Sequence, residues 1–99
     1  MNTIYYASVR HTLTGGGWSR FAAVGGFSLD TLEEARAALL DWFRALTCDV
    51  EGDADTLADL EAQVKQLTLQ EVMVIDADVH GLAGLEHDRY EIVINPESF

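Results

Sequence analysis

Residues 31–46 read TLEEARAALLDWFRAL, and this stretch decides the fold because its apolar residues recur at intervals of three and four. That spacing places them along one side of a helix of about four turns. Asp30 or Thr31 can cap the first exposed amides, and Glu33 or Glu34 follows at capping-box distance. The predicted amphipathic helix has as its apolar positions Leu32, Ala35, Leu39, Trp42, Phe43 and Leu46.

A second helix is predicted after a connecting loop. Residues 47–55 are acidic, contain Gly52 and show no periodicity, which is typical of a loop. Beyond them Asp55 and Asp59 come early and Lys65 comes late, an order that suits the helix dipole. The apolar positions of this helix, again at helical spacing, are Leu57, Leu60, Val64 and Leu67.

Runs of strand-forming residues flank the helical centre on both sides. Residues 3–11 and 18–24 alternate in character and are separated by glycines, which predicts a hairpin with a flexible tip. Residues 72–75 and 89–95 predict two further strands, the last one ending at Pro96. The order ββααββ predicts an α+β fold with an antiparallel sheet of about four strands and two helices packed on one face.

Length and composition predict one domain over residues 1–99. Hydrophobic residues make up 48% of the chain, enough for one core. The single cysteine, Cys48, excludes an intramolecular disulfide and a Cys-based metal cage, and favours a reducing compartment. We expect no signal peptide, no bilayer-spanning segment and no anchoring to a membrane. Arg outnumbers Lys, and Ala and Leu are frequent, which favours an origin in a GC-rich bacterial or phage genome. With the reducing compartment that the single cysteine favours, we expect a location in the cytoplasm of a bacterial host.

The net charge of −11 is the most distinctive feature. Six Lys and Arg against seventeen acids argue against direct binding to nucleic acid or to anionic membranes. A dense negative field favours association with a basic protein surface, including one that normally holds nucleic acid. The alternative is that the charge only maintains solubility. The partner-binding residues that we predict are Asp41, Asp49, Glu51, Asp53, Asp55, Asp59 and Glu61.

Two groups of side chains contain the residue types of a metal site. The acids of residues 49–55 alternate as in a calcium loop, but the glycine is misplaced and the twelfth position is Leu60 instead of Glu. Asp76, Asp78 and His80 share one face if the third strand extends that far, and His87 and Asp88 lie across the predicted hairpin. Solvated polar residues are the stronger interpretation of both groups, so we expect no metal and no cofactor.

Nucleophilic chemistry is not indicated either. Cys48 follows a helix end, which does not favour its thiolate, and we expect it to be a small buried or half-buried side chain. Residues 15–17 are glycines but lack the Lys-Ser/Thr of a phosphate-binding loop. For Trp18 and Phe21 core packing is the stronger expectation, and the alternative is an anchor for a partner. The sequence therefore predicts a protein that is not an enzyme.

In size, in its acidic helical centre from Asp30 to Glu61 and in its flanking strands, the chain resembles small acidic inhibitors encoded by phages and other mobile elements, notably anti-CRISPR proteins and DNA mimics. The resemblance is one of type, without a diagnostic motif, and transfers no specific residue. It implies steric blocking of a nucleic-acid-binding complex by acids that meet Lys/Arg clusters. Two other hypotheses stay open: a homodimeric accessory domain paired through a sheet edge or face, and a small metal-binding module.

Overall fold

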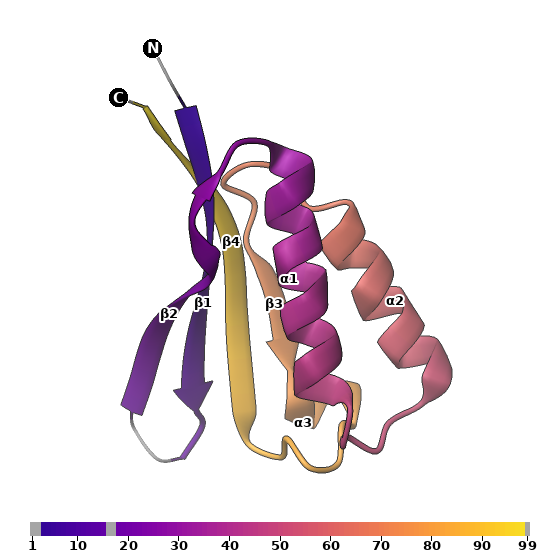
Figure 1. Ribbon diagram of the computed structural model, residues 1–99. Helices are drawn as coiled ribbons and strands as arrows, with labels where there is room; N and C mark the ends of the chain where they lie inside the picture. The colour runs from indigo at the N-terminus through magenta and orange to yellow at the C-terminus, as the bar shows by residue number, and fades with distance from the viewer. Residues whose placement is uncertain (1–2, 16–17, 99) are drawn as a thin grey trace.

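The computed structural model describes residues 3–15 and 18–98, and the side chains of these residues outside 25–28. The predicted α+β class is confirmed, and a one-turn helix, α3, is added between the last two strands (Figure 1). The elements in chain order are β1 Thr3–Leu13, β2 Trp18–Leu29, α1 Leu32–Thr47, α2 Ala54–Lys65, β3 Met73–Asp76, α3 Ala77–His80 and β4 Asp88–Ser98.

The strands form one antiparallel sheet in the order β2-β1-β4-β3. β1 pairs with β4 along its whole length, from Thr3 opposite Ser98 to Leu13 opposite Asp88. The first and last strands of the chain are therefore central neighbours, as Figure 1 shows. β2 forms one edge of the sheet over twelve residues, whereas β3 forms the other over four.

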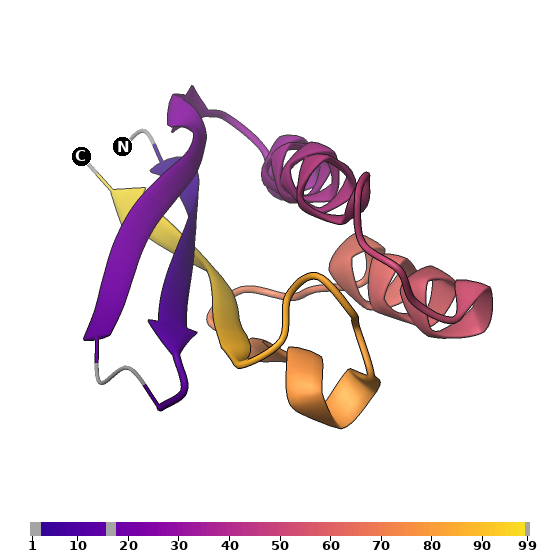
Figure 2. The ribbon, with the colours of Figure 1, turned by 90° about the horizontal axis from the view of Figure 1, so that it is seen from below.

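Both long helices cover the same face of the sheet (Figure 2). Along β4 the residues Tyr90, Ile92 and Ile94 are buried toward the helices, and Glu91 and Val93 between them are half-buried on the opposite side. This alternation is the two-residue period of a strand with one covered face. In the described part of the chain no helix covers the opposite face. The largest fully buried side chains are Phe43, Leu39, Leu60, Ile75, Leu82, Ile92, Ile94 and Val64.

The beginning of α1 confirms the predicted capping box. The hydroxyl of Thr31 accepts a hydrogen bond from the Glu34 N–H at 3.1 Å, and the carboxylate of Glu34 accepts one from the Asp30 N–H at 2.9 Å. Two otherwise unpaired donors are thus satisfied at one helix end. α2 begins similarly, because Asp53 is its N-cap and accepts a hydrogen bond from the Asp55 N–H at 3.3 Å.

The predicted strand limits are shifted by one or two residues in β1, in β3 and at the start of β4, and β2 and β4 end well beyond their predicted limits. β2 continues past Val24 to Leu29 because its register shifts: Ala7 lies opposite Val24, but Tyr5 lies opposite Leu29. β4 continues past Pro96 to Ser98. A proline is tolerated there because β3 pairs only with residues 89–92 of β4, and among the described residues no strand pairs with β4 beside Pro96 on that side.

The predicted flexible tip falls on residues 16 and 17, which lie outside the described residues. Among the described residues, no helix has the length and apolar character needed to cross a membrane.

Candidate functional site

The seven predicted partner-binding carboxylates lie on α1, on α2 and on the loop between the two helices. Six of these side chains are exposed, and only Glu61 is half-buried. We call this set the acidic helical surface; it comprises Asp41, Asp49, Glu51, Asp53, Asp55, Asp59 and Glu61.

The loop between α1 and α2 is fixed on the loop that follows α3. The Glu51 N–H donates to the Ala83 carbonyl at 3.1 Å, and the Ala83 N–H donates to the Glu51 carbonyl at 2.8 Å. A Cβ added at Gly52 would lie only 2.8 Å from Cδ2 of Leu82, so the two loops are in close contact. The exposed carboxylates of Asp49 and Glu51 therefore project from a backbone that is held in place.

The basic residues of α1 and α2 leave most of this surface without counter-charge. Arg44 and Lys65 both contact the carboxylate of Glu61, at 3.0 Å and 3.5 Å. The hydrogen bond from Arg44, together with the charges of Arg44 and Lys65, lowers the pKa of Glu61 despite the opposing effect of burial. The third base, Arg36, donates from Nε to the Leu67 carbonyl at 2.7 Å. Within the described residues, the other six carboxylates form no ion pair.

Some of these carboxylates also have structural roles. Asp53 caps α2, and Asp59 accepts a hydrogen bond from Gln63 at 3.1 Å. Glu61 links the two helices through its contact with Arg44. In the part of the chain that the structure describes, no side chain hydrogen-bonds to the carboxylates of Asp41, Asp49, Glu51 and Asp55.

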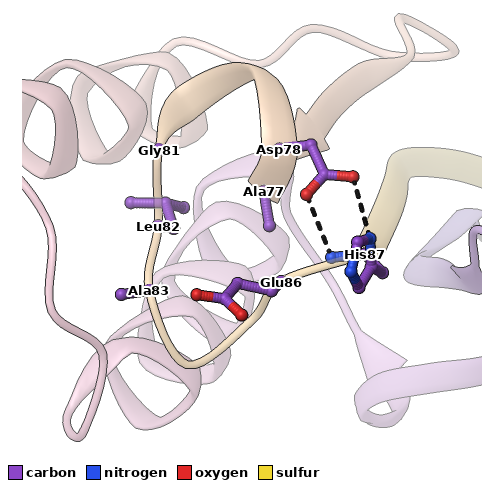
Figure 3. Close-up of a pocket in the computed structure, with 7 residues that line it drawn as sticks. All are labelled: Ala77, Asp78, Gly81, Leu82, Ala83, Glu86 and His87. Carbon is purple, nitrogen blue, oxygen red and sulfur yellow. Dashed lines mark hydrogen bonds and ion pairs between the residues drawn. The ribbon is translucent and has the colours of Figure 1, made fainter.

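A hollow of about 340 Å³ lies beside α3 (Figure 3). The carboxylate of Asp78 accepts a hydrogen bond from the His87 backbone N–H at 3.3 Å, and its other oxygen lies 3.3 Å from Nδ1 of the same residue. The backbone of His87 is left-handed, with a φ of 69°. Glu86 adds a second carboxylate to the lining. The lining holds no hydroxyl or thiol that could serve as a nucleophile, so this acid–imidazole pair lacks the third member of a triad.

The predicted grouping of Asp76, Asp78 and His80 on one strand face is wrong. β3 ends at Asp76, whose carboxylate caps α3 by accepting the N–H groups of Asp78 and Val79. His80 turns back to the Asp76 backbone, with Nδ1 at 2.7 Å from its carbonyl oxygen. Across residues 3–15 and 18–98, no group of three His, Cys, Asp or Glu side chains is arranged to hold a metal ion.

His11 belongs to an aromatic cluster that the sequence did not predict. Its ring stacks on Tyr90 with 4.5 Å between centroids and meets Trp18 edge to face at 5.1 Å. Its Nε2 lies 2.9 Å from the Asp88 carboxylate. Burial, together with the negative charge of Asp88, raises the pKa of Tyr90 to about 12. His11 and Asp88 are 77 positions apart, and only the pairing of β1 with β4 makes them neighbours.

Three burial expectations are wrong. Trp18 and Phe21 are 45% and 70% exposed instead of being core residues. They lie on β2, an edge strand, and the Arg10 guanidinium of β1 lies 5.6 Å from the centroid of the Phe21 ring. Cys48 is exposed at the C-cap of α1 instead of being buried or half-buried.

Comparison with known proteins gives no assignment: no protein-family model matches the chain, and no curated protein or solved structure matches it at a significant level.

Proposed function

We propose that the protein is a non-catalytic binding domain that docks on a basic protein surface through the acidic helical surface. The partner class that suits this chemistry best is a nucleic-acid-binding complex, which the protein would inhibit by occupying the site of the phosphate backbone. The resemblance to anti-CRISPR proteins and DNA mimics supports the same partner class.

The observation that carries the proposal is the separation of charge along the chain. Residues 1–29 contain no acid and two arginines, Arg10 and Arg20. Residues 30–99 contain all seventeen acids against four Lys or Arg, which gives this part a formal charge of −13. Such an asymmetric field orients an approaching partner before contact and raises the rate of association.

The support from geometry is that the carboxylates are both exposed and anchored. Helices and a fixed loop hold the backbone that carries them, so little backbone ordering opposes binding. A Lys/Arg cluster that normally releases counterions from a nucleic acid gains the same electrostatic attraction from a fixed array of carboxylates. Asp49 and Glu51 are exposed, lie on the loop whose backbone is held, and have no side-chain partner among the described residues. They are therefore the most informative residues to change.

The test compares two variants that change net charge equally. Asp49→Lys with Glu51→Lys alters the acidic helical surface, and Asp30→Lys with Glu97→Lys alters exposed acids outside it; each pair changes the net charge from −11 to −7. Each variant and the wild-type protein is used as bait in a nuclease-treated bacterial lysate at about 50 mM and about 500 mM NaCl. Bound proteins are identified by mass spectrometry, and the affinity is then measured with the purified partner.

We expect a basic nucleic-acid-binding protein to bind wild type at low salt and to be lost at high salt. The Asp49/Glu51 variant should bind about tenfold more weakly with a smaller salt dependence, a loss of about 1.4 kcal/mol. The Asp30/Glu97 variant should bind within about twofold of wild type. Equal weakening by both variants would mean that only net charge matters, and no capture of a basic protein would contradict the proposal.

A further inference from the structure

The first half of β2 is exposed on both faces of the sheet. We call residues 18–24 the β2 arm; every side chain from Trp18 to Ala23 is exposed, and only Val24 is buried. Phe21 lies on the uncovered sheet face, where it contacts Arg10, and Trp18 lies on the helix-facing side against His11. Trp and Phe side chains are large and apolar, so removing them from water is favourable. A strand added beside the β2 arm could cover both of these aromatic side chains, one on each face of the sheet.

The two edges of the sheet differ in how well they are protected against pairing. β3 is an edge strand of only four residues. The β2 arm spans seven residues, contains no proline and holds one charge, Arg20. Short length, charges and prolines are the usual means by which an edge strand avoids adding another strand, and β2 has almost none of them before its register shift after Val24.

Charge selects a second copy of this chain as the partner of the β2 arm. Two copies of a chain with a net charge of −11 repel each other, and they repel least when they meet at a surface without acids. Neither β1 nor β2 contains an acid, whereas the other edge strand, β3, ends in Asp76. α2 packs on α1 and on β3, away from the β2 edge, so contact along β2 keeps the α2 carboxylates of the two copies apart (Figure 2).

We propose that the β2 arm pairs antiparallel with the β2 arm of a second copy, giving a continuous eight-stranded sheet with two-fold symmetry. Full overlap of residues 18–24 centres the pair on Phe21, which then lies opposite the partner's Phe21. In this register Trp18 lies opposite the partner's Val24 and Arg20 lies opposite the partner's Ala22, so the two arginines do not face each other. The paired residues keep the same face because the strand period is two. This inference does not depend on the acidic helical surface.

The contact area predicts a weak dimer. From their exposed fractions of 70% and 45%, Phe21 and Trp18 supply roughly 250 Å² per copy, given about 200 Å² or more for a whole aromatic side chain. With the backbone edge and the smaller side chains, two copies bury on the order of 1,000 Å², which lies below the standard interface size. We therefore expect a dissociation constant in the micromolar range, with backbone hydrogen bonds fixing the register.

Sedimentation and light scattering test whether the mass of the protein in solution depends on its concentration, as a weak dimer requires. Wild type should change from the monomer mass of 10.9 kDa to twice that value between about 1 µM and about 1 mM protein. Phe21→Asp should remain a monomer over this range. Val79→Asp is the matched control, since Val79 is a 78% exposed apolar residue on α3 and receives the same charge; this variant should dimerise as wild type does.

Cross-linking tests the register and also serves if Phe21→Asp fails to fold. In a Cys48→Ser background, Phe21→Cys places two thiols directly opposite each other, at a Cα separation of about 4.5–5.5 Å that suits a disulfide. Oxidation should give a covalent dimer with Phe21→Cys and no more than background with Val79→Cys. A strictly monomeric wild type up to about 1 mM would overturn the inference. So would dimerisation of a folded Phe21→Asp variant, or equal cross-linking at residues 21 and 79.

Discussion

Phe43 and Phe21 are the same residue type in opposite environments, one buried and one exposed. Replacing each with alanine therefore tests whether the two side chains are buried and exposed as the structure shows. Phe43 is 1% exposed between α1 and the sheet, whereas Phe21 is 70% exposed on the edge strand. Phe43→Ala should lower the free energy of unfolding by about 3–5 kcal/mol, because it removes buried apolar contacts and leaves a cavity. Phe21→Ala should change it by no more than about 0.5 kcal/mol in the monomer.

These values are large relative to the whole stability of such a chain. A 99-residue domain is stable by about 5–15 kcal/mol, so Phe43→Ala removes a substantial part of the total. At about 4–8 °C per kcal/mol, its melting temperature should fall by roughly 12–40 °C. Phe43→Leu, expected to cost less, provides a folded intermediate case if Phe43→Ala does not fold.

The assay is urea unfolding followed by far-UV circular dichroism, at the lowest protein concentration that gives a signal. Low concentration matters because dimer formation stabilises the folded state by mass action. The small effect of Phe21→Ala should grow as the protein concentration is raised, whereas the effect of Phe43→Ala should not. A loss of 2 kcal/mol or more for Phe21→Ala in the monomer would show that the β2 arm packs against the protein's own core, and would refute the reasoning built on its exposure.

Three further predictions concern local structure. Thr31→Ala should destabilise the fold by about 1 kcal/mol in urea unfolding by removing the N-cap of α1, whereas Thr31→Ser, which keeps the hydroxyl, should be close to wild type. The pKa of Tyr90 is raised from 10.0 to about 12, so the neutral side chain contributes fully to the free energy of unfolding below pH 10 and this contribution is lost as the pH rises to 12. Stability in urea unfolding should therefore fall between pH 10 and pH 12, and Tyr90→Phe should reduce the fall. Gly81→Ala should lower the melting temperature, with a cost of about 1 kcal/mol, because Gly81 ends α3 with a φ of 69°, and Gly81→Asn should lower it less.

The helices were predictable because their signals are local. The three- and four-residue spacing of the apolar positions and the Thr31–Glu34 capping box lie within a few residues of one another, and both have the predicted form in the structure. The helix α3 was missed for the opposite reason. A one-turn helix has too few residues for a periodic pattern, and it depends on Asp76 as its cap and Gly81 as its end.

The residues of the candidate sites also differ in whether local sequence predicts their environment. The acidic residues were predictable as exposed because charges on a helix or a loop rarely leave water. The exposure of Trp18 and Phe21 was not predictable, since it depends on β2 being an edge strand that extends beyond the cover of the helices. The His11 cluster also required the strand order, because β1 and β4 come from opposite ends of the chain.

The pairing of β1 with β4 has a consequence for how the protein is made. The central ladder of the sheet joins Thr3 to Ser98, so it cannot be completed until the residues of β4 have left the ribosome. Until then β1 has only β2 beside it, and an isolated hairpin is at best marginally stable in water. The sheet should therefore form late, after residues 88–98 have emerged, and slowly for its size, because its main contacts join residues that are distant in sequence. Slowing the synthesis of residues 30–98 would prolong the period in which an acid-free hairpin is open to aggregation or to a chaperone.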